Sequence, residues 1–167
     1  GGVTAADIPK QDISTNNSMY YMVEPSVSDI GTNYVITWKF GTTSIYALVY
    51  NSSNSYVAGP ILIDNVSGTS LSMPSVFKSF TENNYIITYQ ENVLDGGGTS
   101  TTIYAKEYSI HSPSRTTSVV RTGTITTVPG DTYAPCYCMQ YAGNYHFMTP
   151  YTSGDVVYYK QNIRNAS

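Results

Sequence analysis

The chain has 167 residues, carries a formal net charge of −3 and is only 11% charged. This length suits a single domain that buries enough core to fold without a metal ion or a disulfide. The eight basic residues stand singly, so a nucleic-acid partner is not expected. No apolar run reaches the roughly 18 residues that a membrane-spanning helix needs. The 17 tyrosines and many β-branched residues favour strands over disorder.

The first predicted element is a strand at residues 6–14, with the sequence ADIPKQDIS. It precedes the first of three repeats in the way that AGPILIDN at 58–65 precedes the second. We therefore interpret residues 6–14 as a fourth strand that has no repeat of its own.

The first repeat covers residues 20–65. It contains Pro25-Ser26-Val27, NYVITW at 33–38, SIYALVY at 44–50 and GPILIDN at 59–65, and each segment has the character of a strand. Within NYVITW, Tyr34, Ile36 and Trp38 share one face and alternate with Val35 and Thr37. Because both faces carry strand-forming side chains, we expect both to be buried.

The second repeat covers residues 70–126. It contains Pro74-Ser75-Val76, NYIITY at 84–89, TIYAKEY at 102–108 and TSVVRTGTIT at 117–126. The asparagine before the second segment suits a tight turn. The connection from Gln90 to Thr101 contains three consecutive glycines after Asp95 and is predicted to be a loop with a flexible tip.

The third repeat covers residues 130–162 and matches more weakly. It contains Pro135-Cys136-Tyr137, NYHFMT at 144–149 and DVVYYKQ at 155–161, and the chain ends without a fourth strand. With residues 6–14 included, the sequence predicts an all-β fold of twelve strands in three four-stranded antiparallel sheets. No helix is expected, because no apolar period of 3.6 residues is present.

The succession P-S-V, N-Y-V-I-T-W, I-Y-A-x-V-Y and G-P-I-L-I-D resembles the β-propeller-type repeats of large, adhesin-like secreted or surface proteins. The resemblance is strong over residues 24–108 and weak after residue 130. It implies four-stranded blades. It implies no single activity, because blades serve binding, scaffolding and catalysis alike.

Three arrangements resolve the mismatch between the spare strand and the incomplete third repeat. The strand closes a ring within the chain, the chain is part of a longer array, or the strand completes the third repeat of a neighbouring molecule. The last arrangement is strand addition, and it grows head to tail into a filament unless it closes. In that case the inter-subunit strand contains Ile8, Lys10, Asp12 and Ile13.

Four N-x-S/T sequons begin at Asn16, Asn51, Asn65 and Asn165, in predicted turns or at chain ends. In a chain this rich in Asn, Ser and Thr, several sequons arise by chance. If they are acceptor sites, they predict N-glycosylation of an extracellular or cell-surface protein. The chain begins Gly1-Gly2-Val3 and shows no signal peptide, which fits a mature or truncated form.

The sequence contains no pattern that predicts a catalytic, metal or cofactor site. Cys136 and Cys138 are expected to lie on one strand face, because side chains two apart point the same way. His146 is expected inside a packed strand and His111 in an exposed loop, with no nucleophile identified beside either. The segment around Asp29 is similar to the Asp-box of sialidase-type propellers, but its Gly-to-Trp spacing is too long.

These observations favour a non-enzymatic extracellular structural protein. We expect it to assemble with itself head to tail by strand complementation, as a glycosylated filament or surface layer, without inserting into a membrane. The alternative is a carbohydrate-binding adhesin or lectin module of a larger surface protein. The tyrosines least tied to the repeat, Tyr20, Tyr21, Tyr158 and Tyr159, are the candidates for contact with a glycan or another partner.

Overall fold

The computed structural model describes residues 22–95, 98–111, 114, 116–129, 132, 134–153 and 156–165. These residues form eleven strands in three antiparallel sheets and contain no helix. The sheets do not close into a barrel. The predicted strand at residues 6–14 lies outside the described residues.

The three sheets follow one another along the chain. Sheet A contains β1 (Met22–Asp29), β2 (Asn33–Phe40), β3 (Ser44–Asn51) and β4 (Tyr56–Asn65) in that spatial order. Sheet B contains β5 (Ser70–Lys78), β6 (Asn84–Asp95), β7 (Gly98–His111) and β8 (Thr116–Pro129), again in order. Sheet C contains only β9 (Tyr137–Tyr141), β10 (Asn144–Ser153) and β11 (Val156–Asn165) among the described residues.

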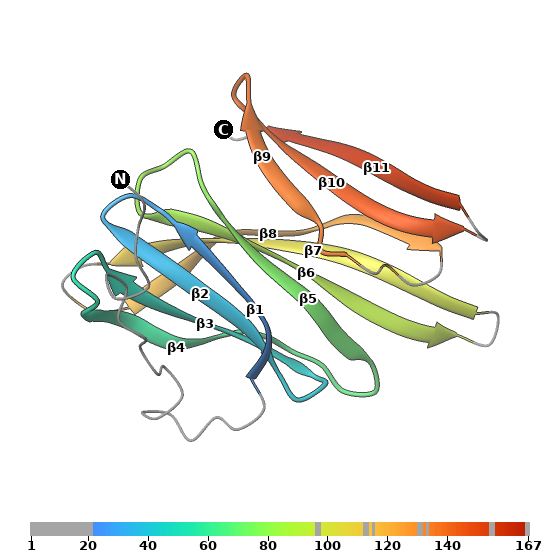
Figure 1. Cartoon of the computed structure of the whole chain (residues 1–167), viewed down its shortest axis with the longest axis horizontal. Helices are drawn as coiled ribbons and strands as arrows, with labels where there is room; N and C mark the ends of the chain where they lie inside the picture. Colours follow the sequence, from blue (N-terminus) through green and yellow to red (C-terminus); the bar gives the residue numbers. More distant parts are fainter. Residues whose placement is uncertain are drawn as a thin grey trace, which may run out of the picture.

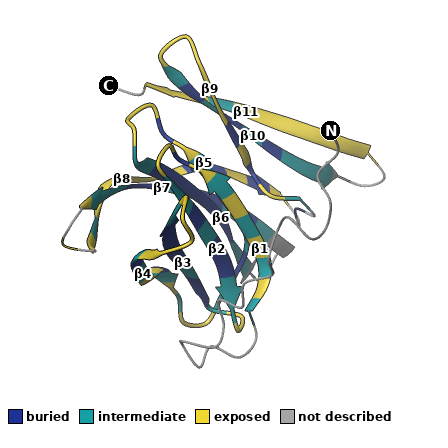
Figure 2. Cartoon of the chain, turned by 60° about the vertical axis from the view of Figure 1, so that its left-hand side comes forward, coloured by how far each residue is buried: buried dark blue, intermediate teal, exposed yellow. Residues whose placement is uncertain are grey.

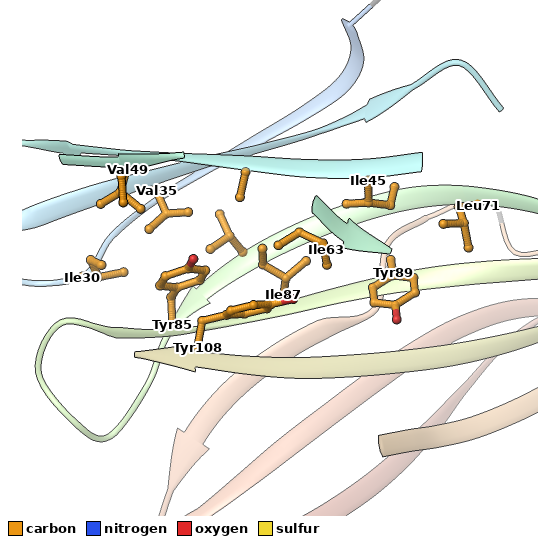
Figure 3. Close-up of a cluster of buried hydrophobic side chains, with 13 residues drawn as sticks. Ile30, Val35, Ile45, Val49, Ile63, Leu71, Tyr85, Ile87, Tyr89 and Tyr108 are labelled. Atoms are coloured by element: carbon orange, nitrogen blue, oxygen red, sulfur yellow. The ribbon is translucent and has the colours of Figure 1, made fainter. Parts of the chain in front are cut away.

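Sheet B lies between the other two and packs one face on each (Figure 1). The first cluster joins sheets A and B and includes Val35, Ile45 and Val49 opposite Tyr85 and Ile87 (Figure 3). All five of these side chains are fully buried. Since burying a large apolar side chain contributes about 1.5–3 kcal/mol, this contact is a major source of stability.

The second cluster joins the opposite face of sheet B to sheet C. It contains Ile86, Ile103, Ala105 and Ile125 from sheet B and Cys136, Cys138, Tyr145 and Phe147 from sheet C or just before it. Each of sheet B's two faces is therefore covered by a different neighbour.

Each sheet has two different faces, which we call the tyrosine face and the valine face. Equivalent positions of the repeat lie on the same kind of face in all three sheets. The tyrosine face is defined by Tyr34, Ile36 and Trp38 in sheet A, by Tyr85, Ile87 and Tyr89 in sheet B, and by Tyr145, Phe147 and Thr149 in sheet C. The valine face is defined by Val35 and Thr37, by Ile86 and Thr88, and by His146 and Met148. At both contacts the tyrosine face of one sheet packs on the valine face of the sheet before it.

The first strands of sheets A and B share an irregularity. Glu24 and Met73, each followed by proline, have φ angles of 53° and 50°, and the strand register shifts at both places. Such angles are uncommon outside glycine and cost about 1–3 kcal/mol. The two bulges touch, because Met73 N donates a hydrogen bond to Glu24 Oε2 at 2.5 Å.

The connection between β6 and β7 differs from the prediction of a loop from Gln90 to Thr101. Both strands continue through this region, so that Asn92 pairs with Thr101 and Asp95 with Gly98. The Thr101 hydroxyl donates to Asn92 Oδ1 at 3.0 Å, and such polar cross-strand pairs extend the sheet beyond its apolar part.

The third repeat is shifted by one residue from the predicted match. Tyr137 pairs with Met148 as Ser26 pairs with Thr37, so Tyr137 and not Cys136 takes the place of Ser26. The extra residue lies between Pro135 and Tyr137, because Tyr137 precedes Asn144 by the same number of positions as Ser26 precedes Asn33.

Replacing Ile87 by alanine tests the contact between sheets A and B. Ile87 is fully buried there, so we expect the free energy of unfolding to fall by about 2–5 kcal/mol in chemical denaturation. Val119→Ala on exposed β8 is the control and should cost less than about 0.5 kcal/mol. Equal losses for the two variants would contradict the packing described.

Candidate assembly site

Sheet C ends at β11, where sheets A and B each continue to a fourth strand. Among the described residues, β11 pairs only with β10. Its counterpart β3 is flanked on both sides and mostly buried, whereas β11 is exposed along nearly its whole length (Figure 2). An exposed edge of this length presents unpaired backbone groups to which another strand can add.

A cavity of about 250 Å³ borders this edge. Its apolar lining includes Ile86, Ala105, Ile125, Tyr145 and Phe147, and its other lining residues come mainly from β8 and the end of β11. In the contact between sheets A and B, the fourth strands β4 and β8 touch. A fourth strand of sheet C would accordingly lie beside β11 and opposite β8, next to this cavity.

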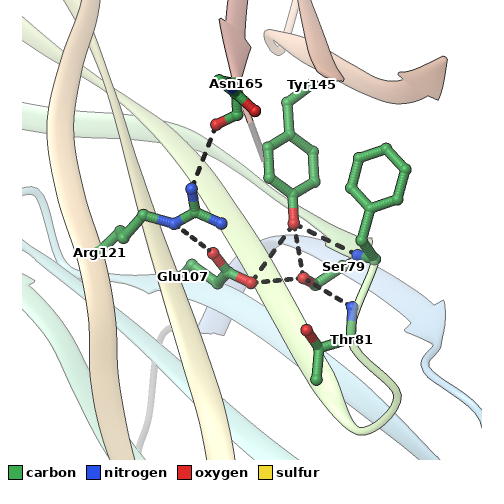
Figure 4. A network of polar contacts seen from close by, with 7 residues as sticks. Ser79, Thr81, Glu107, Arg121, Tyr145 and Asn165 are labelled. Carbon is green, nitrogen blue, oxygen red and sulfur yellow. Dashed lines mark hydrogen bonds and ion pairs between the residues drawn. The ribbon is translucent and has the colours of Figure 1, made fainter. Parts of the chain in front are cut away.

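A polar network holds sheet C on sheet B beside the cavity (Figure 4). The buried Glu107 carboxylate accepts hydrogen bonds from Ser79 Oγ, from Arg121 Nε at 2.9 Å and from Tyr145 OH at 3.4 Å. Arg121 Nη1 donates in turn to the backbone oxygen of Asn165 at 3.2 Å. Burying a carboxylate costs free energy unless it is paired in this way. The network therefore fixes the orientation of sheet C on sheet B.

The three sequons within the described residues begin at the last residue of β3, β4 and β11. Asn51 Oδ1 accepts hydrogen bonds from the backbone N–H groups of Ser53 and Ser55. The side-chain oxygen of Asn51 therefore stabilises the turn. Asn65 Nδ2, the atom that would carry a glycan, donates to Ser44 Oγ at 2.9 Å. Asn165 is exposed and lines the cavity. The fourth sequon, at Asn16, and the predicted inter-subunit residues Ile8, Lys10, Asp12 and Ile13 lie outside the described residues.

Cys136 and Cys138 point to the same side, as their spacing predicts, and both are free thiols in the contact between sheets B and C. Burial raises the pKa of Cys136 to about 11, despite a hydrogen bond from Thr149 that lowers it. Burial also raises the pKa of Cys138 to about 12. Thiolate is the reactive form of cysteine, so both residues are chemically inert in the folded protein near neutral pH.

The predictions for the two histidines are wrong in part. His146 lies on the valine face of sheet C, half-exposed, because no described sheet packs there; Gln161 Nε2 lies 3.0 Å from its Nδ1. His111 is exposed, as predicted, but ends β7 instead of lying in a loop. Its Nε2 lies 2.7 Å from Ser118 Oγ, a pairing that sequence spacing did not reveal. The partners of the His111 ring within the described residues are hydroxyl groups, from Ser109 and Ser118.

Asp29 and Asp64 have structural partners. Asp29 Oδ1 accepts from the backbone N–H of Gly31 at 2.8 Å and so closes the turn after β1. Asp64 accepts a hydrogen bond from Tyr89 OH and lies 3.3 Å from Lys106 Nζ, across the contact between sheets A and B. No group of three or more potential metal-binding side chains occurs in the described part of the chain.

The chain matches no protein-family model, and comparisons with curated proteins and with solved structures find no significant similarity. Within the described residues, no helix has the length and apolar character needed to cross a membrane.

Raising the pH should destabilise the fold through its buried tyrosines. Burial, with a smaller effect of the Asp64 charge, raises the pKa of Tyr108 from 10.0 to about 12. The unfolded chain therefore loses this proton first, and the free energy of unfolding falls as the pH rises from 10 towards 12. Tyr108 alone should account for about 1 kcal/mol at pH 11. Chemical denaturation of Tyr108→Phe should show a shallower pH dependence, whereas Tyr141→Phe at an exposed site should not.

Proposed function

We propose that this chain is a non-enzymatic extracellular structural subunit that assembles head to tail. Residues 6–14 of one copy add to β11 of another and supply the fourth strand of its sheet C. The observation that carries this proposal is the exposed edge of β11 beside a cavity lined by apolar side chains, at the position where the other two sheets have a fourth strand.

The composition of residues 6–14 suits this position. The segment has nine residues against the ten of β11, so the two can pair over nearly their whole length. Pro9 lacks a backbone N–H, which is acceptable in a strand that forms the sheet edge. β4, the fourth strand of sheet A, also contains a proline, Pro60. Main-chain hydrogen bonds would provide affinity, and alternate side chains would fill the cavity.

Charge also favours the insertion. The cavity is lined by Glu107, Arg121 and Arg164 besides its apolar residues. Lys10 and Asp12 lie two apart and share a strand face. Asp12 would meet the positive charge of Arg164 there. Such a pair would fix the register of the added strand more than it would strengthen it.

Deleting residues 1–15 tests the proposal, with deletion of residues 1–5 as the matched control that keeps the strand. We expect full-length protein and the shorter deletion to form polymers in negative-stain microscopy and light scattering, and the longer deletion to remain monomeric. A synthetic peptide of residues 6–14 should bind the longer deletion and raise its melting temperature. Polymers of unchanged length after deletion of residues 1–15, or a monomeric full-length protein, would refute strand complementation.

Glycosylation is the second part of the proposal, because the three described sequons stand at strand ends where a glycan can project. N-glycosylation replaces one of the two hydrogens on Nδ2, and the Nδ2 of Asn65 already donates to Ser44, whereas Asn51 uses only its oxygen in the turn. We therefore expect mass spectrometry of glycopeptides from native material to find higher occupancy at Asn51 than at Asn65. Unmodified asparagine at every sequon would contradict a glycoprotein.

A carbohydrate-binding module is the alternative, and one observation favours it. Tyr137, Tyr141 and Tyr159 are 59%, 67% and 70% exposed on one face of sheet C, and exposed aromatic rings can stack on sugars. Clear binding on a glycan array by a protein that stays monomeric would favour this function over assembly.

A further inference from the structure

We infer that consecutive copies also meet face to face, with the tyrosine face of sheet A in one copy stacked on the valine face of sheet C in another. This inference rests on the proposed head-to-tail assembly and identifies a second contact surface for it. The strand exchange concerns the edge of sheet C, whereas this contact concerns the broad faces at the two ends of the stack.

The tyrosine face of sheet A is apolar and has no described sheet against it. Trp38, Leu48 and Tyr50 form its buried floor, with Tyr34, Ile36, Phe40 and Tyr46 packed around them. Tyr56 and Leu62 from β4 stand beside this cluster and are 41% and 50% exposed. All described members of the cluster come from sheet A itself.

The valine face of sheet C is apolar as well. Its exposed members include Met139 on β9 and Tyr159 and Ile163 on β11, all about half exposed or more. In register they flank Met148, Pro150 and His146 of the central strand. A continuous apolar surface of this kind is unusual on a monomer and typically marks an interaction site.

The chain itself shows what covers such faces. Tyr85 stacks on Tyr108 and Tyr89 on Tyr104 in sheet B, and sheet A covers this arrangement with its valine face. The same ring pairs occur in sheet A, as Tyr34 on Tyr50 and Trp38 on Tyr46. By the rule that holds at both internal contacts, the tyrosine face of sheet A takes a valine face, and the unpartnered valine face among the described sheets belongs to sheet C.

These two faces cannot meet within one molecule, because sheet B lies between sheets A and C and the faces look away from each other. The occupant that we infer is a second copy, because it brings the one kind of face that covers a tyrosine face at both internal contacts. The contact joins different surfaces of the two copies, so it is heterologous and propagates in the same direction as the strand exchange.

One unsatisfied atom supports the same occupant. Trp38 is 1% exposed, and its Nε1 has no hydrogen-bond partner among the described residues. Its counterpart in sheet B, Tyr89, donates from its hydroxyl to Asp64 across the contact between sheets A and B. A buried donor without a partner is costly, and an occupant of this face would supply the missing acceptor.

Fluorescence quenching tests the contact, because Trp38 is the only tryptophan of the chain. A nitroxide label is placed on Tyr159→Cys in a Trp38→Phe background and mixed in excess with unlabelled wild-type protein. The native thiols are buried, so the label goes to the new cysteine. We expect the emission of wild-type Trp38 to fall by half or more on assembly. The same label on Val119→Cys, outside both end faces, should change it little.

A charge variant gives a second readout that leaves residues 6–14 intact. Met139→Lys combined with Ile163→Lys should raise the protein concentration needed for assembly tenfold or more, whereas Val119→Lys should not. If deletion of residues 1–15 abolishes assembly but neither quenching nor the charge variant has an effect, the face contact is refuted and strand complementation stands. A monomeric wild-type protein would refute both.

Discussion

The packing of a tyrosine face on a valine face is the contact on which the rest of this molecule depends. A four-stranded sheet with apolar side chains on both sides cannot bury them alone, because each face needs a neighbouring element to cover it. Sheet B obtains one on each side and contains many of the fully buried large side chains. The middle of the stack is therefore its best-packed part, and the faces without a described neighbour lie at its two ends.

Polar groups make the two internal contacts different from each other. Between sheets A and B, Lys106 donates to the Ile63 carbonyl at 2.6 Å and lies near Asp64, which also accepts from Tyr89. Between sheets B and C, Glu107 and its partners take this role. Apolar faces can slide, whereas buried charges with matched partners tolerate only one alignment. The apolar residues shared by the repeats thus hold neighbouring sheets together. The polar residues in which the repeats differ set how each pair of sheets is aligned.

The sequence predicted the strands well because their signal is local. NYVITW and NYIITY each lie within one strand. The expectation that both faces of NYVITW are buried holds for Val35, Thr37 and Trp38, whereas Tyr34 and Ile36 are only half-buried. The assignment of faces to neighbours could not be read from the pattern, since tyrosine and valine are both strand formers. The position of His146 was wrong for the same reason: alternation shows that a residue has a face, but not whether another sheet covers it.

The candidate site was only half visible in the sequence. The missing fourth strand followed from comparing the repeats, but the cavity depends on contacts between residues as distant as Ile86 and Asn165. The extension of β6 and β7 was not predicted, because three consecutive glycines after Asp95 are typical of a flexible loop. The pairing of His111 with Ser118 was missed because it depends on the register between β7 and β8.

The proline bulge of β1 has a consequence for how this protein avoids uncontrolled aggregation. β1 is an edge strand, and a flat edge invites sideways pairing with any other exposed strand. Pro25 is exposed on that edge and lacks the N–H that such pairing requires, and the turn of the backbone at Glu24 bends the strand away from a straight template. A chain with so few charges gains little protection from electrostatic repulsion. The strained backbone at Glu24 therefore protects solubility, since it blocks one direction of association while the opposite edge of the molecule stays open.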